Sequence, residues 1–298
     1  MIFLMVISMK FSDSDNGLSA LPPDSFPKKD SFIELEKLIG LREVKRTLAE
    51  VTAFSLIQAK RTQLHLKADP TALHMLFKGN PGTGKTTVAR ILGNIFKEIN
   101  ILSKGHLVEV ERADLVGEFI GHTAQKTKEM IKKSLGGIMF IDEAYTLAQG
   151  GEKDFGQEAI ATLVKAMEDY REDIIVILAG YSTEMNRFIR SNPGLRSRFP
   201  IHIDFCDYDN EELFLIALQM YAERDYQLSN RCRWKLKNEL NNFIRTRHPH
   251  SGNARYVRNL VEKSIRLQAL RIIDKEGLSR RDLMIIEDTD LPEIINQL

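Results

Sequence analysis

Eight consecutive residues, 79–86, have the types and the spacing that phosphate binding requires: Gly-Asn-Pro-Gly-Thr-Gly-Lys-Thr. The glycines allow the backbone to curl so that its N–H groups face a phosphate, and a helix starting near Lys85 would aim its positive end at the same group. Lys85 can reach the β- and γ-phosphates, and the Thr86 hydroxyl can ligate Mg²⁺. An apolar run precedes the segment and a helical pattern follows it, which favours a nucleoside triphosphate site over a glycine-rich turn. The residues assigned to this ligand are Gly79, Asn80, Pro81, Gly82, Thr83, Gly84, Lys85, Thr86 and Thr87, the last as a spare hydroxyl.

An acidic pair, Asp142 and Glu143, follows four apolar residues that read as a buried strand. Ligands of open α/β sheets bind at the carboxyl ends of the strands, so Asp142 suits the Mg²⁺ shell and Glu143 suits a general base that polarises the attacking water. The alternative is a helix cap, which the upstream phosphate loop makes the weaker interpretation. A strand and a helix, expected within 106–135, separate the two motifs, as in phosphate-loop ATPases with a catalytic glutamate and unlike nucleoside kinases.

Two groups of arginines could complete such a site. Arg196 and Arg198 lie in a segment expected to be a turn after the fourth strand. An arginine presented at a subunit edge can reach the γ-phosphate of a neighbouring subunit, although turn arginines also pair with surface carboxylates. Gly252-Asn-Ala-Arg opens a helix, so Arg255 would lie in its first turn and could cover the phosphates, with Arg258 as the alternate. A cation at a helix start opposes the helix dipole, which favours a functional reason for it.

The elements that must hold these side chains follow from the apolar pattern. Helical spacing begins near Phe32, is interrupted at Gly40, and returns between the strands. The runs 137–141 and 174–178 lack polar alternation, which is typical of parallel strands covered on both faces. The pattern predicts strands at 73–77, 106–110, 138–142, 174–179 and 201–205, helices ending near 99, 135 and 170, and then helices alone at 209–224, 229–247 and 252–276. We therefore expect a flexible arm (1–31), an α/β domain with a five-stranded parallel sheet (32–206) and a small all-helical domain (207–298).

Composition narrows the functional classes. The 298 residues carry 42 basic and 41 acidic side chains, a net charge of +1, so no overall field favours nucleic acid or an anionic membrane. Cys206 and Cys232 are too few for a disulfide framework, and we expect both to be buried in a protein of the cytoplasm. The apolar start, Met1–Ser8, is too short to span a bilayer and lacks the features of a signal peptide; Met9 is an alternative start.

These residues together resemble the AAA+ ATPases. The resemblance rests on the phosphate loop, on Phe140-Ile-Asp-Glu-Ala-Tyr, on Leu195-Arg-Ser-Arg-Phe and on Gly252-Asn-Ala-Arg in this order. Further segments, such as Asp114-Leu-Val-Gly-Glu-Phe-Ile-Gly-His-Thr and Leu178-Ala-Gly-Tyr, are similar to the subgroup that contains the red-type Rubisco activase and a sporulation protein, and the sporulation protein is the nearer of the two. The similarity covers about residues 32–290.

The resemblance implies an ATPase that uses ATP and Mg²⁺, assembles as a ring, usually a hexamer, and grips a substrate polypeptide in a central pore. Arg198 fits the arginine finger better than Arg196. Phe119, Ile120 and Gly121 match the first pore loop, although by sequence alone Phe119 reads as a core anchor. The segment 150–153 matches the second pore-loop region, and Leu38, Ile39 and Gly40 match the adenine-side segment.

One departure from the family concerns the end of the fourth strand. Most AAA+ ATPases place Asn or Thr there as a γ-phosphate sensor, whereas this chain has Ala179-Gly180-Tyr181-Ser182. The sequence therefore does not identify the residue that senses the γ-phosphate.

The function expected from the resemblance is ATP-driven remodelling of a protein substrate, with a role in sporulation. The alternatives are a nucleotide-gated scaffold, a Rubisco-activase-like chaperone, and a helicase or clamp loader, which would need a nucleic-acid surface. We set aside a metal site at His248 and His250, because no third ligand is predicted beside them.

Overall fold

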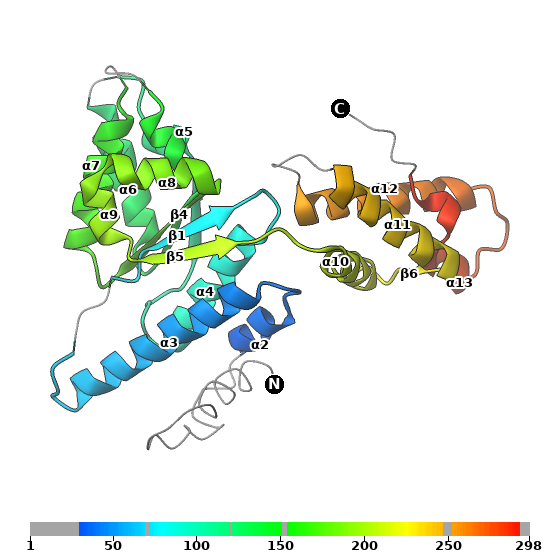
Figure 1. The fold of residues 1–298 in the computed structure, drawn as a ribbon, viewed down its shortest axis with the longest axis horizontal. Coiled ribbons are helices and arrows are strands. Elements are labelled where there is room, and N and C mark those ends of the chain that lie inside the picture. The colour runs from blue at the N-terminus through cyan, green and yellow to red at the C-terminus, as the bar shows by residue number, and fades with distance from the viewer. Residues whose placement is uncertain (1–29, 69–71, 120, 151–153, 247–251, 293–298) are drawn as a thin grey trace. The chain divides into compact units, whose positions relative to one another are not determined.

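The computed structural model describes residues 30–68, 72–119, 121–150, 154–246 and 252–292 (Figure 1). The described chain forms two compact units. The first contains the residues up to Gly79 together with Lys85–Phe205, and the second contains Asn80–Gly84 together with the residues from Cys206 onward.

The first unit is built on a parallel sheet of five strands in the order β2-β3-β4-β1-β5. All residues of β1, β3 and β4 are buried, which confirms the fold class expected from their unbroken apolar runs. The strand bounds are β1 Met75–Gly79, β2 Leu107–Val110, β3 Gly137–Ile141, β4 Ile174–Gly180 and β5 Ile201–Phe205.

Two apolar layers cover the two faces of this sheet. Phe77 and Phe140 point into a cluster with residues of α2, α3 and α4, whereas Leu76 and Met139 point into a second cluster with residues of α6 to α9. This alternation along each strand gives both faces an apolar layer. Helices cover both faces of the sheet (Figure 1). The helices are α2 Asp30–Lys37, α3 Arg42–Gln63, α4 Lys85–Glu98, α5 Arg112–Leu115, α6 His122–Ser134, α7 Gly156–Asp169, α8 Ser182–Ser191 and α9 Pro193–Arg198, with a 3₁₀ turn η1 at Ala144–Ala148.

The segment that carries Arg196 and Arg198 is a helix, so the expected turn is wrong. The Asn192 side chain accepts hydrogen bonds from the backbone N–H groups of Gly194 at 2.9 Å and Leu195 at 3.2 Å. Pro193 occupies the first helical position, where its missing N–H costs nothing. Asn-Pro therefore starts a short helix, α9, and both arginines lie in its last turn.

Within its described residues, the second unit is helical apart from one pair of two-residue strands. Its long helices match the expected ones within a few residues at each end, and β6 pairs in parallel with β7. Asp209 starts α10 through a capping box with Glu212, whose backbone N–H it accepts at 2.8 Å. The bounds are α10 Asn210–Ala222, β6 Gln227–Leu228, α11 Asn230–Thr246, α12 Asn253–Ile272, α13 Arg280–Met284, β7 Ile285–Ile286 and η2 Asp288–Asp290.

The two cysteines differ in environment. Cys232 in α11 is buried as expected, and burial raises the pKa of its thiol to about 12. Cys206 is exposed, which corrects the expectation that both are buried: it directly follows the edge strand β5. None of the helices in the described ranges is long and apolar enough to cross a bilayer.

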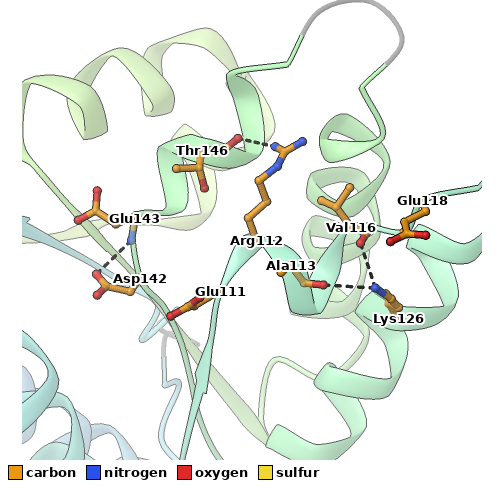
Figure 2. A pocket seen from close by; sticks show the side chains of 10 residues that line it. Glu111, Arg112, Ala113, Val116, Glu118, Lys126, Asp142, Glu143 and Thr146 are labelled. Atoms are coloured by element: carbon orange, nitrogen blue, oxygen red, sulfur yellow. Dashed lines mark hydrogen bonds between the residues drawn. The ribbon is translucent and has the colours of Figure 1, made fainter.

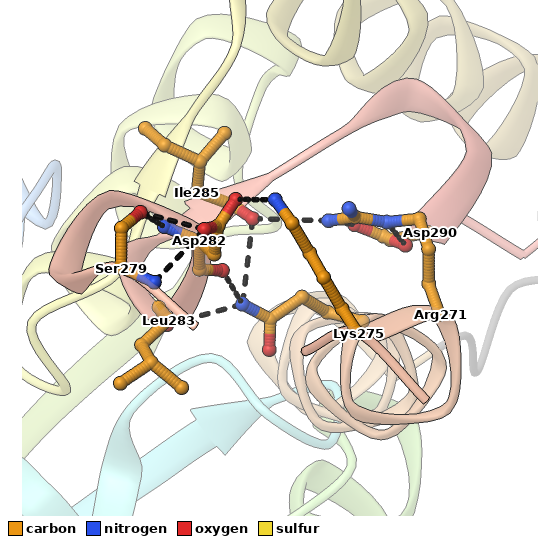
Figure 3. A network of polar contacts seen from close by, with 8 residues as sticks. Arg271, Lys275, Ser279, Asp282, Leu283, Ile285 and Asp290 are labelled. Carbon is orange, nitrogen blue, oxygen red and sulfur yellow. Dashed lines mark hydrogen bonds and ion pairs between the residues drawn. The ribbon is translucent and has the colours of Figure 1, made fainter. Parts of the chain in front are cut away.

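An ion pair joins the end of α12 to the 3₁₀ turn η2 in the second unit (Figure 3). The Arg271 guanidinium donates to both carboxylate oxygens of Asp290, at 2.7 and 2.8 Å, and Asp290 is almost fully buried. Gln268 donates to the carbonyl oxygens of Asp282 and Leu283 beside this pair. Arg271 thus has a partner within its own unit.

Replacing Arg271 by methionine is expected to lower the free energy of unfolding by about 3–5 kcal/mol, because it leaves the Asp290 carboxylate buried without its counter-charge. Urea denaturation measures this loss. Arg266→Met on the same helix is the control, since Arg266 is exposed, and a change within about 0.5 kcal/mol is expected there. A small loss in Arg271→Met that is equal to the control would show that the pair contributes little.

Candidate nucleotide site

The phosphate-binding loop has the backbone that its glycines predict. Gly79, Gly82 and Gly84 have positive φ angles of 155°, 72° and 97°. A β-carbon on Gly79 would collide with the carbonyl oxygen of Phe205, and one on Gly82 would collide with that of Gly252. The loop is thus closely confined at two points, and residues with side chains could not adopt this path without displacing the backbone around it.

The residues that follow the loop begin helix α4. Lys85 is its first residue; its ammonium donates to the carbonyl oxygen of Gly79 at 2.8 Å and is largely buried. The lysine is therefore tethered to the residue that opens the loop. Thr86 is half-buried, whereas Thr87 is exposed.

Three residues of the second unit brace the loop, and sequence reasoning missed them. Asp207 accepts from the side-chain amides of Asn80, at 2.9 Å, and Asn253, at 2.8 Å. The backbone N–H of Tyr208 donates to the Asn253 side chain at 3.1 Å, and its phenol donates to the carbonyl oxygen of Thr83 at 3.1 Å. Burial, aided by the charge of Glu212, raises the pKa of Tyr208 to about 12, so this phenol stays a donor at neutral pH.

Asn253 belongs to the Gly-Asn-Ala-Arg segment, in which the sequence predicts a role for Arg255 alone. Its φ of 41° lies in the left-handed region, which asparagine tolerates better than most residues. That tolerance is the one signal in the sequence that could have marked it. Arg255 and Arg258 lie at the start of α12 as expected, and both side chains are exposed.

The acidic pair lies where the sequence places it, directly after β3. The backbone N–H of Asp142 donates to the carbonyl oxygen of Val110 at 3.1 Å, which extends the β2–β3 ladder by one residue and leaves the Asp142 carboxylate exposed. Glu143 has a φ of 47°, and its N–H donates to the Asp142 carboxylate at 3.0 Å (Figure 2). The chain therefore turns sharply between the two acidic residues.

The strand order brings the two motifs to one edge of the sheet. Strands β1 and β3 both neighbour β4, and all three are parallel, so the residues that follow them gather at their carboxyl ends. The Thr86 hydroxyl and the exposed Asp142 carboxylate are hard oxygen donors of the kind that Mg²⁺ prefers, and the confined glycine loop suits a phosphate. Mg²⁺ bound there would neutralise charge on the phosphates of the nucleotide.

An open groove of about 780 Å³ lies beside Glu143 (Figure 2). Its walls are the acidic pair, Thr146 of η1, the segment that follows β2, and Lys126 of α6. The lining residues are Glu111, Arg112, Ala113, Val116, Gly117, Glu118, Lys126, Asp142, Glu143 and Thr146.

Arg112 connects the walls of this groove. Its guanidinium donates to the carbonyl oxygen of Thr146 and, at 2.5 Å, to the carboxylate of Asp154. Burial opposes ionisation of Asp154, but the bonds from Arg112 and from the backbone of Gly156 outweigh it and lower the pKa of this carboxyl. A single side chain thus joins the segment after β2, the turn after Glu143 and the start of α7.

Arg198 and Arg196 have different environments on α9. Arg198 is partly buried; it pairs with Glu168 of α7 at 3.4 Å and donates to the carbonyl oxygen of Gly194 at 3.4 Å. Arg196 is exposed. Burial, together with the charge of Arg198, lowers the pKa of nearby His74 to about 4, although a hydrogen bond to Met167 opposes the shift, so His74 is neutral at pH 7.

The segment proposed as a pore loop presents its aromatic residue to solvent. Phe119 is 64% exposed and packs edge-on against the ring of His122, with centroids 5.5 Å apart. Its interpretation as a core anchor is therefore wrong. Gly121, with a φ of 83°, caps α6, and the Thr123 hydroxyl accepts from the backbone of Gly117 at 2.9 Å, which holds the base of the loop.

The adenine-side candidates lie in the segment between two helices. Ile39 and Gly40 are half-buried between α2 and α3, where the Lys45 ammonium donates to the carbonyl oxygen of Leu38 at 2.6 Å. Ile120, residues 151–153, and the two histidines His248 and His250 lie outside the described residues.

Comparisons with known proteins decide the family. Residues 75–207 match the model of the ATPase family associated with various cellular activities (AAA), and residues 209–298 match the AAA lid domain. The chain belongs to the AAA ATPase family. It is thus a nucleotide-binding ATPase, as its phosphate loop and acidic pair indicated, and its helical second unit corresponds to the lid of that family.

Several curated relatives share most of their length with this AAA ATPase. It is 58% identical to stage V sporulation protein K of Bacillus subtilis over 259 residues, which are 87% of this chain and 80% of the relative. It is 44% identical to protein CbbX of Cereibacter sphaeroides, with 88% and 86% covered. The chloroplastic ribulose bisphosphate carboxylase/oxygenase activase of Cyanidioschyzon merolae is 43% identical, with 86% and 87% covered.

Solved structures show the same fold at low identity. The FIGL-1 AAA domain in complex with ADP is similar with a TM-score of 0.58 at 15% identity, covering 97% of this chain and 87% of that one. This likeness extends over both units. It supports the fold alone.

Proposed function

We propose that this AAA ATPase hydrolyses Mg·ATP at sites shared between the subunits of a ring, which we take to be a hexamer, and uses the energy to remodel a protein substrate. The observation that carries the proposal is the gathering of Lys85, Thr86, Asp142 and Glu143 at one edge of the sheet. In this scheme Lys85 and the loop bind the phosphates, Thr86 and Asp142 hold Mg²⁺, and Glu143 accepts the proton of the attacking water.

The completion of this site by a neighbouring subunit is supported by the position of Arg198. It lies on α9, paired with Glu168, and it does not line the groove beside Glu143 in the described part of the chain. Arg198 would therefore act as a finger toward the nucleotide of the next subunit, and Arg255 would approach the phosphates from the lid. Residues 39 and 40 would lie on the adenine side. The domain limits proposed for this machine are 1–31, 32–206 and 207–298.

The action on a protein substrate is supported by Phe119. An aromatic side chain at 64% exposure, on a loop whose base is fixed by Thr123, is suited to gripping a polypeptide. We propose that Phe119, Ile120 and Gly121 form this grip and that Arg112, which joins the segment before the loop to the turn after Glu143, transmits the state of the site to it.

The cellular role is proposed from the relatives. The 58% identity to stage V sporulation protein K favours a role in spore maturation, in the cytoplasm, over a Rubisco-activase-like role, because the activase is 43% identical.

A capture experiment tests the remodelling proposal. Tagged Glu143→Gln protein in ATP should retain its client, because binding without hydrolysis holds the gripped state, and the client should be lost when Phe119→Ala is added or when ADP replaces ATP. Gln125→Ala, exposed on the nearby helix α6 and absent from the lining of the groove beside Glu143, is the control for Phe119→Ala. Equal capture with and without Phe119 would contradict a pore grip and favour the nucleotide-gated scaffold.

A further inference from the structure

A phenol contacts the carboxylate to which we assign the general-base role. Tyr145 lies two residues after Glu143, in the 3₁₀ turn η1, and its hydroxyl donates a hydrogen bond to Glu143 Oε2. The backbone of Glu143 is held at the same time by the Asp142 carboxylate, at 3.0 Å. Both the main chain and the carboxylate of Glu143 are therefore oriented by neighbours within the same turn.

The Tyr145 ring is itself seated against the end of strand β4. A β-carbon on Gly180 would lie 2.9 Å from the Tyr145 ring and 2.9 Å from the sulfur of Met185. The ring of Tyr181 lies 6.3 Å from that of Tyr145. Gly180 has no positive φ, so the space for the ring, and not the backbone conformation, is what requires a glycine here.

We propose that Tyr145 is a positioning residue that latches Glu143: its hydroxyl holds the carboxylate in the observed orientation and must release it before Glu143 can accept a proton from water. This inference rests on the proposed role of Glu143. The phenol fixes the Glu143 carboxylate in one orientation. Turning the carboxylate toward a water molecule requires this hydrogen bond to break. The Tyr145 ring packs against Gly180 at the end of β4. This is the place where most AAA+ ATPases have Asn or Thr and this chain has neither. Any movement of residues 179–182 is thereby transmitted to the Tyr145 ring and to the bond on Glu143.

Steady-state ATP turnover of Tyr145→Phe tests the latch. This variant keeps the ring and its packing on Gly180 and removes only the hydroxyl, so kcat is expected to rise about three- to tenfold, because one hydrogen bond to a charged group no longer has to be broken. The KM for ATP, the affinity for ADP and the melting temperature should not change. A merely structural role for Tyr145 would change the melting temperature and leave kcat the same. A fall in kcat, or an unchanged kcat, would overturn the proposal.

Two further variants test whether the contact between Gly180 of β4 and the Tyr145 ring affects Glu143. Gly180→Ala should displace the ring and raise kcat in the same direction, and adding Tyr145→Phe to it should bring little further increase; fully additive effects would contradict the link. Tyr170→Phe removes an exposed phenol at the end of α7 and is the control.

Glu143→Gln separates the failure of this inference from the failure of the proposed function. If Glu143→Gln retains turnover, the general-base assignment fails; if it abolishes turnover while Tyr145→Phe is unchanged, only the latch fails.

Discussion

Replacing Glu143 by glutamine is expected to lower ATP turnover by about 10²- to 10⁴-fold, because the amide cannot accept the proton of the attacking water. The substitution preserves size and leaves Lys85, Thr86 and the glycine loop intact, so ATP should still bind with an affinity close to that of the wild type. Phosphate release measures the first quantity, and equilibrium titration with a fluorescent ATP analogue measures the second.

Two control variants make this result specific. Glu129→Gln, on the exposed side of α6, should turn over ATP at the wild-type rate. Lys85→Ala should lose nucleotide binding itself, since it removes the cation tethered at the loop. Turnover at the wild-type rate by Glu143→Gln would contradict the assignment of the general base.

Replacing Arg198 by alanine is expected to lower turnover by about 10³- to 10⁵-fold, the range found for arginine fingers, because the charge that develops on the γ-phosphate loses its partner. Nucleotide binding to the subunit's own loop should persist. The measurement is again phosphate release, at a protein concentration at which the wild type is assembled.

Arg196→Ala is the matched control for this prediction. Arg196 lies two residues earlier on α9 and is exposed, so its loss should change turnover little. An equal loss of ATP turnover in the two variants would mean that α9 acts through its net charge. Unchanged turnover in Arg198→Ala would contradict its role as an arginine finger.

The fold and the chemical motifs of this protein could be predicted because they depend on contiguous residues. The unbroken apolar runs of β3 and β4 predicted buried parallel strands, and they also placed Asp142 at a strand end. Helix α9 was missed since six residues are too few for a period to show, although Asn192-Pro193 is a helix start.

What could not be predicted depends on residues that are distant in sequence. The brace of the phosphate loop joins Asp207 to Asn80 and Asn253, and the space for the Tyr145 ring is provided by Gly180. The exposure of Phe119 likewise depends on packing, because by sequence alone this aromatic residue reads as a core anchor. The roles assigned to the site residues stay predictions that the variants above test.

Mixing the two inactive variants tests most directly the claim that the site is shared between subunits. Glu143→Gln subunits keep Arg198, and Arg198→Ala subunits keep Glu143, so an intact site forms wherever an Arg198→Ala subunit receives the finger of a Glu143→Gln neighbour. In an equal, random mixture about a quarter of the neighbouring pairs meet this condition. Distinct tags and tandem capture ensure that only mixed oligomers are assayed. The account predicts that they recover up to about a quarter of wild-type turnover, whereas turnover no higher than that of the separate variants would contradict it.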